Sequence, residues 1–109
     1  MKVLVLSDSD ALCGPMAAAF LRDFSPSWKV VSAGIRAAQS IDPLAVEVMH
    51  ESLIRLEGYV PRDWSEVDSS EFDVLYHCPE IEVPTTLEDY RELRDFIKNE
   101  AFLFFRKLQ

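Results

Sequence analysis

Short apolar runs alternate along the chain with longer segments in which apolar residues recur every three or four positions. Residues 2–6, 28–35 and 72–76 are runs of the first kind, and they are rich in the β-branched or aromatic residues typical of buried strands. Residues 81–83 have the composition of a short fourth strand. The pattern therefore predicts a sheet of three or four strands.

Three helices are predicted between and after these runs. The first begins at Pro15, where a proline costs no hydrogen bond, and ends before Ser25. The second begins after Asp42, which is placed to cap it, and ends at Gly58. The third runs from Thr86 to the end. Their inner stripes are predicted to consist of Met16, Ala19, Phe20 and Phe24; of Ala45, Val48, Met49, Leu53 and Leu56; and of Leu87, Tyr90, Leu93, Ile97, Ala101, Phe104 and Leu108.

The alternation of strands and helices predicts a parallel sheet, because a helix between two strands returns the chain to the same end of the sheet. Helices on both faces of that sheet give a three-layer open α/β sandwich. Such sheets bind ligands at the carboxyl ends of their strands, so the loop after residues 2–6 is the predicted place for a site. Residues 59–71 are polar and predict a loop with a short helical turn, and residues 1–109 are expected to form one domain.

Composition and charge narrow the classes of partner. Hydrophobic residues make up 49% of the chain, which is typical of a globular protein. No apolar stretch approaches the roughly 20 residues of a membrane span and no leader is visible, so we expect a cytoplasmic protein. The net charge is −8 without a basic patch, which argues against nucleic acid and anionic membranes. We expect a monomer or weak homodimer with a protein partner and no cofactor.

The chain has two cysteines, Cys13 and Cys78, and two histidines, His50 and His77. They are too few for a disulfide framework and lack the spacing of a zinc site. We interpret the histidines as ordinary surface residues. The loops after the first and third strands are expected to be neighbours, which would bring Cys13 and Cys78 close enough for a redox couple.

Asp8 and Asp10 directly follow the first strand. An Asp-x-Asp in this place is typical of haloacid-dehalogenase-type phosphotransferases, in which magnesium lies between a nucleophilic and an acidic aspartate. The lysine and the further acidic pair which that chemistry needs are not evident. Two other interpretations remain: the two carboxylates bind a divalent cation without catalysis, or they cap the turn and the following helix.

Five stretches occur in the order and with the gaps of one known family. They are Pro15-Met16-Ala17, Ser32-Ala33-Gly34, Asp42-Pro43-Leu44-Ala45, Gly58-Tyr59-Val60-Pro61-Arg62 and Tyr90 to Ile97. Together they resemble the low-molecular-weight protein tyrosine phosphatases and their thioredoxin-linked arsenate reductase relatives, over nearly the whole chain. The resemblance implies the α/β fold of phosphotyrosine protein phosphatase I, an open sandwich with a short parallel sheet.

The chemistry of that family needs three groups. A Cys thiolate at the end of the first strand attacks phosphorus or arsenic, an Arg and backbone N–H groups cradle the oxyanion, and in the phosphatases an Asp before a Pro protonates the leaving group. The matched stretches place the nucleophile at Ser7, the Arg at Cys13 and the general acid at Val83. The loop Gly and Asn of the family, and the Ser or Thr after its Arg, fall on Ser9, Asp10 and Gly14.

Each replacement removes a chemical capability. The Ser7 hydroxyl lacks a low pKa and a neighbouring base, Cys13 supplies no cation, and Val83 transfers no proton. Asp8 and Asp10 add negative charge where a dianion would bind. We therefore expect a non-catalytic relative that acts as a binding or regulatory protein. Residual phosphatase or arsenate reductase activity at the same loop is the alternative. The candidate binding residues are Ser7, Asp8, Ser9, Asp10, Ala11, Leu12, Cys13 and Gly14.

Partner contacts are expected at three places. These are the loop 7–14, the segment 59–64 with its aromatic residues, and Phe102–Phe105, because one helix cannot bury all four of the last residues against the sheet. Trp28 and Trp64 are interpreted as packing residues.

Overall fold

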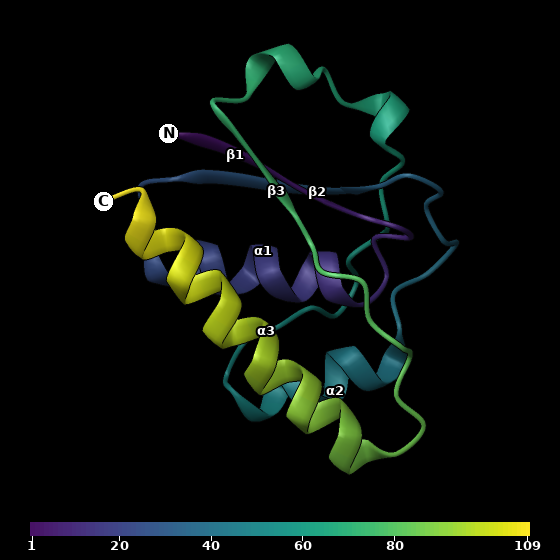
Figure 1. Ribbon diagram of the computed structural model, residues 1–109. Helices are drawn as coiled ribbons and strands as arrows, with labels where there is room; N and C mark the ends of the chain where they lie inside the picture. Colours follow the sequence, from purple (N-terminus) through teal and green to yellow (C-terminus); the bar gives the residue numbers. More distant parts are fainter.

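The computed structural model describes all residues 1–109 and contains three strands and three α-helices (Figure 1). The strands are β1 (Lys2–Ser7), β2 (Lys29–Gly34) and β3 (Val74–His77). The helices are α1 (Cys13–Phe24), α2 (Pro43–Glu51) and α3 (Leu87–Lys107). Two short 3-10 turns, η1 (Trp64–Glu66) and η2 (Ser69–Glu71), precede β3.

The three strands form a parallel sheet in the order β2-β1-β3, which confirms the predicted α/β class. β1 is the central strand, and its Val3 and Val5 are fully buried. A central parallel strand is covered on both faces, which explains the continuous apolar run at the start of the sequence. The loop that follows β1 therefore begins from the middle of the sheet.

The two faces of the sheet are covered differently. All three helices lie on one face, and the segment that carries η1 and η2 crosses the other (Figure 1). The expectation of helices on both faces is corrected accordingly. On the second face Leu4, Leu6 and Ala33 are buried, and Val67 and Phe72 from the polar segment pack against them. Two apolar side chains in that segment thus take the place of a helix stripe.

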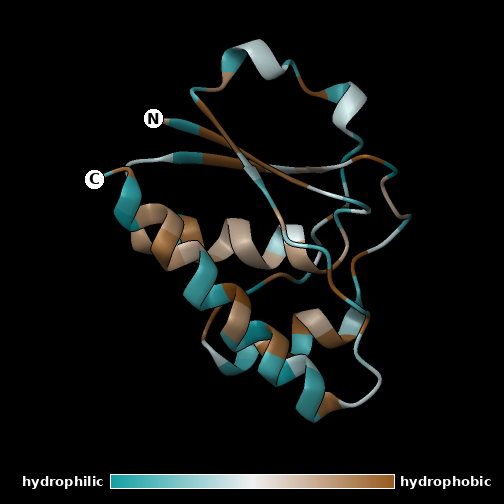
Figure 2. Ribbon diagram, in the orientation of Figure 1, coloured by the Kyte–Doolittle hydropathy of each residue, from teal (hydrophilic) through white to brown (hydrophobic).

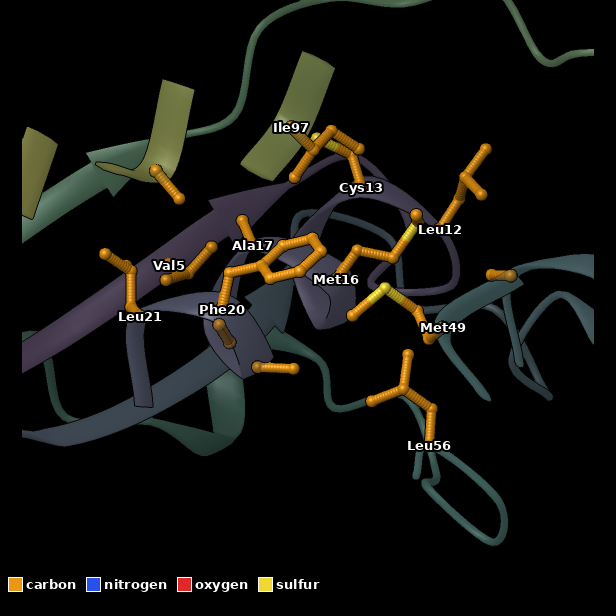
Figure 3. Close-up of a cluster of buried hydrophobic side chains, with 14 of the residues drawn as sticks. Val5, Leu12, Cys13, Met16, Ala17, Phe20, Leu21, Met49, Leu56 and Ile97 are labelled. Atoms are coloured by element: carbon orange, nitrogen blue, oxygen red, sulfur yellow. The ribbon is translucent and has the colours of Figure 1, made fainter. Parts of the chain in front are cut away.

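The main core lies between the sheet and the helices. Met16, Phe20 and Leu21 of α1 are buried with Val5 and with Met49 of α2 (Figure 3). Hydrophobic residues gather on the strands and on α1, whereas α3 alternates between hydrophilic and hydrophobic residues (Figure 2). The predicted inner stripe of α3 is confirmed at its centre, because these residues are buried: Tyr90, Ile97 and Ala101.

The second helix is shorter than its apolar pattern predicted. It begins after Asp42, whose carboxylate accepts a hydrogen bond from the Leu44 amide at 2.9 Å, as a cap should. It ends at Glu51, because Leu53 takes a left-handed φ of 62° that interrupts the helix. Leu53 is 93% exposed, so its prediction as a stripe residue is wrong. Leu56 is buried as expected, but it packs from the loop.

Residues 81–83 do not form the fourth strand that their composition allowed. Pro79 and Pro84 flank them, and proline cannot donate to a ladder of strand hydrogen bonds. No residue from 79 to 85 donates or accepts a backbone hydrogen bond. β3 is therefore an edge of the sheet.

Most residues that were predicted to be exposed or to pack are found as predicted. Both histidines are exposed, and Trp28 packs edge-on against Phe105. Trp64 differs from the expectation of a packing residue, since 47% of it is exposed. Phe102 and its neighbour Leu103 are also among the exposed apolar residues, as the pattern of the last helix predicted. No helix is both long and apolar enough to span a bilayer.

Candidate binding site at the carboxyl end of the sheet

A cavity of about 390 Å³ opens at the carboxyl ends of β1 and β3, where the sequence placed the site. It is lined by residues 6–9, 12–13, 77–81, Ile35 and Val83. The structure therefore brings most of the candidate loop into one cavity with the residue at the general-acid position. Asp10, Ala11 and Gly14 are not part of this lining.

Hydrogen bonds from the segment that follows β2 hold the loop between β1 and α1 in place. Backbone N–H groups of Ile35, Arg36, Ala38 and Asp42 donate to four carbonyl groups of the loop, over N···O distances of 2.8 to 2.9 Å. Those carbonyls belong to Ser7, Asp8, Ser9 and Ala11. The shape of the loop is thus set by backbone contacts that do not depend on its side chains.

Gly34 permits this close approach of the two segments. A Cβ atom at Gly34 would lie 2.7 Å from the carbonyl carbon of Ser9 and 2.8 Å from the amide nitrogen of Asp10. Real Cβ atoms do not come so near to backbone atoms, so any larger residue would displace the loop.

Asp10 is the buried anchor of the loop. It has no exposed surface and a left-handed φ of 55°. Its Oδ2 atom accepts hydrogen bonds from the Arg62 amide at 2.9 Å and from the Tyr59 hydroxyl, whereas Oδ1 has no partner. A buried carboxylate is costly unless donors surround it, so these contacts tie the loop to residues 59–62.

Tyr59 links the anchor to the sheet. Its hydroxyl lies 2.7 Å from the Ser32 Oγ atom on β2 while it donates to Asp10. Burial, followed by the hydrogen bond to Asp10, raises the pKa of Tyr59 to about 12. Sequence reasoning assigned Tyr59 to a partner surface and missed this role. The signal was available, because Tyr59 lies in one of the five stretches that carry the family resemblance.

The Ser7 hydroxyl takes part in a hydrogen bond within the loop. Its Oγ atom accepts a hydrogen bond from the Asp10 amide at 3.2 Å. A Cβ atom on Gly14 would lie 2.6 Å from Ser7 Oγ and 3.2 Å from Asp10 Oδ1, so these three residues converge at the start of α1. No side chain caps α1, which corrects the interpretation that Asp8 or Asp10 caps this helix.

The two aspartates face different surroundings. Asp8 is exposed and lines the cavity, whereas Asp10 is buried against Tyr59 and Arg62. No group of three or more His, Cys, Asp or Glu side chains is arranged to hold a metal ion. Of the two carboxylates, only Asp8 faces the cavity, so the geometry adds no support to the dehalogenase-type interpretation or to a cation site.

The structure brings the two cysteines together, as the expected proximity of their loops implied. Cys13 is 5% exposed and Cys78 is half-buried, and both are free thiols that line the cavity. The Cys78 amide donates to the Leu6 carbonyl at 2.9 Å, which holds Cys78 beside the end of β1. The Cys13 thiol and, after it, burial raise the pKa of Cys78 well above its usual range.

No basic side chain other than His77 lines the cavity. The guanidinium of Arg22 instead donates to the Val30 carbonyl at 2.9 and 3.1 Å, and Arg62 contributes its backbone amide to Asp10. The charged residues in the lining are Asp8 and Glu80. The cavity thus favours apolar or positively charged groups over anions.

A known protein family matches almost the whole chain. The family model for low molecular weight phosphotyrosine protein phosphatase matches residues 2–101. Among curated proteins, no sequence matches the chain.

Solved structures with the same fold include phosphatases and arsenate reductases. An arsenate reductase from Archaeoglobus fulgidus is 23% identical, with a TM-score of 0.82 over 95% of this chain and 98% of that one. The tyrosine phosphatase Wzb from Escherichia coli K30, in complex with sulphate, is 17% identical, with a TM-score of 0.86 over 99% and 98%. The YwlE arginine phosphatase from Geobacillus stearothermophilus is 19% identical, with a TM-score of 0.81 over 99% and 92%. At these identities the likeness shows the fold alone.

Removing the Tyr59 hydroxyl should loosen the loop. Tyr59→Phe deletes a donor to a buried carboxylate, so we expect the free energy of unfolding to fall by about 1.5–3 kcal/mol. Denaturant unfolding measures this loss, and amide NMR spectra show where it acts. Ser70→Ala is the control, because it removes a 2.6 Å side-chain hydrogen bond to Asp68 in η2, away from the loop. Only Tyr59→Phe should move the amide signals of residues 7–14; equal spectra for both variants would contradict the anchoring role.

A methyl group at Gly34 should displace the loop. We expect Gly34→Ala to lower the free energy of unfolding by about 1–3 kcal/mol, since the new Cβ would overlap backbone atoms of Ser9 and Asp10. Thermal or urea unfolding tests this, with the exposed Ser40→Ala as a control expected to change stability by less than about 0.5 kcal/mol. A Gly34→Ala variant as stable as the control would show that the approach is not tight.

Proposed function

Because the chain belongs to the low-molecular-weight phosphotyrosine protein phosphatase family, we propose that it is a non-catalytic member that acts as a binding or regulatory protein. Its ligand is a group on a protein partner, held in the cavity beside residues 7–14. The observation that carries this proposal is the state of the nucleophile position. Ser7 there accepts a hydrogen bond from the Asp10 amide, and no base contacts its hydroxyl.

The charge of the cavity supports the same conclusion. An oxyanion needs cations and free N–H groups around it, and a thiolate nucleophile needs a group that lowers its pKa. Here Asp8 and Glu80 are the charged residues of the lining, within a chain of net charge −8. A phosphate dianion would be repelled by both carboxylates.

The general-acid position gives independent support. Val83 lines the cavity, and its side chain cannot donate a proton to a leaving group. Glu80 and Glu82 lie nearby in sequence, and neither precedes a proline as the resemblance requires. Each of the three groups that the family chemistry uses is thus replaced by one that cannot perform its step.

The lining also indicates the chemistry of the ligand. Seven of its thirteen residues are hydrophobic, and exposed carboxylates stand at its rim on Asp8 and Glu80. An amphipathic cation, such as the side chain of an Arg or Lys, buries its apolar stem in such a cavity and keeps its charge near the acids. We therefore propose a partner that presents a basic or apolar side chain.

Catalysis should be absent in the purified protein. We expect no hydrolysis of an aryl phosphate above the rate in buffer, because nucleophile, cation and acid are all missing. A sensitive spectrophotometric assay of the full chain measures this. Turnover that disappears in both Ser7→Ala and Cys13→Ala, but persists in the exposed Asp23→Asn, would contradict the proposal and locate residual activity at the loop.

Binding should follow the charge of the cavity. In an amide NMR titration we expect inorganic phosphate to leave residues 7–14 unmoved and N-acetylarginine amide to shift them saturably. Asp8→Asn should weaken that binding several-fold by removing a carboxylate from the rim, whereas Asp23→Asn, exposed on α1, should leave it unchanged. Saturable shifts with phosphate, or no difference between the two variants, would overturn the assignment.

A further inference from the structure

The outer edge of β3 has no partner within the chain. β3 pairs with β1 on one side only, and residues 81–83, which follow it, form no strand. Apart from the ladder to β1, the backbone of residues 74–77 makes no hydrogen bond. A row of free N–H and C=O groups along the edge of a sheet is a template for pairing with another strand.

The side chains of this edge alternate between the two faces of the sheet. Tyr76 is buried on the face that the helices cover. Leu75 pairs with Leu4 and therefore lies on the other face, where 45% of it is exposed. Asp73 and His77 share this face, because they lie two residues away on either side, and both are exposed. The edge thus presents an apolar residue between a carboxylate and an imidazole.

We propose that two copies of this chain associate through their β3 edges, which pair antiparallel about a two-fold axis at Leu75. In antiparallel pairing, opposite residues share a face and their Cβ atoms lie about 4.5–5.5 Å apart. With the axis at Leu75, the two Leu75 side chains meet, and Asp73 of each copy lies opposite His77 of the partner subunit. The segment is therefore complementary to itself, as a two-fold interface requires.

The side chains specify this register. A shift by one residue would place exposed side chains opposite those that face the core. A shift by two residues would place Leu75 opposite a polar side chain and leave Asp73 and His77 unpaired with each other. The Asp73 carboxylate is already held at the start of β3, since its Oδ2 atom accepts a hydrogen bond from the Lys2 amide at 2.8 Å. Its Oδ1 atom remains to accept an imidazole N–H.

The last helix is arranged in a complementary way. α3 runs beside β3 in the opposite direction (Figure 1). An open cavity of about 610 Å³ separates the two, and its lining from α3 consists of Glu100, Leu103, Phe104, Arg106 and Lys107. An axis normal to the sheet reverses α3 together with β3, so Glu100 of each copy is turned towards the basic end of the partner subunit's helix. No ion pair within the chain uses Arg106 or Lys107.

This association does not rest on the proposed function. The edge of β3 lacks a partner whether or not the cavity beside residues 7–14 holds a ligand. The occupant is a second copy rather than an unrelated strand, because the order of carboxylate, leucine and imidazole matches its own reverse.

Sedimentation equilibrium of the full chain over a range of concentrations tests the proposal. Physiological salt screens the charge of −8 on each copy and so reduces the general repulsion between copies. We expect a monomer–dimer equilibrium, with amide NMR signals of residues 73–77 that move as the concentration rises. A chain that stays monomeric up to about 1 mM, or a dimer that leaves these signals unmoved, would overturn the proposal.

An exchange of charges tests the register. His77→Asp places a carboxylate opposite Asp73 at both ends of the pairing, so we expect the dimer to dissociate about tenfold more readily. His50→Asp is the matched control, because it makes the same change at an exposed histidine of α2 and should leave the dissociation constant unchanged.

Two further variants keep the test independent of any one substitution. Asp73→Lys combined with His77→Asp restores opposite charges and should recover the dimer. Leu75→Lys places two ammonium groups at the axis and should abolish it, also where His77→Asp fails to fold. A dimer that Leu75→Lys leaves intact, or no recovery in the folded double variant, would show that the β3 edges are not the interface in this register.

Discussion

The buried carboxylate of Asp10 is the contact on which the carboxyl end of this sheet depends. It receives the Tyr59 hydroxyl and the Arg62 amide, and through Tyr59 it reaches Ser32 on β2. The loop after β1, the second strand and the segment after α2 are thereby joined at one point. Because a buried charge without its donors costs several kcal/mol, the three segments can hardly separate while the protein remains folded.

This anchoring separates the shape of the loop from its chemistry. The backbone of the loop is set by Asp10, by the close approach at Gly34 and by hydrogen bonds to residues 35–42. The side chains that face the cavity take no part in most of these backbone contacts, so they are free to change without loss of the fold. A family fold therefore persists here around a site whose charged groups are acidic, and function has to be argued from the site.

The sequence predicted the strands and the inner face of α3 well, because their periodicity reports burial directly. The sequence was a poorer guide at places where one or two residues end a helix or prevent a strand. The left-handed turn at Leu53 ended α2 early, and two prolines prevented the strand at 81–83. The bond between Asp10 and Tyr59 joins residues far apart in the chain, and no local pattern reveals such a pair. The resemblance pointed to both residues separately, whereas only the structure showed them in contact.

The cavity combines one rigid wall with one that is weakly restrained. A ligand or a covalent bond can change a protein only through a part that has more than one arrangement of similar energy. The wall formed by the loop after β1 is held by hydrogen bonds to its carbonyl groups and by Asp10. Residues 79–85, in the other wall, are held only by side-chain packing and by the hydrogen bond from the Cys78 amide to the Leu6 carbonyl. Segments with few backbone hydrogen bonds open at the lowest free energy. A partner bound in the cavity, as proposed, would therefore act through residues 79–85 and change the shape of the cavity from that side.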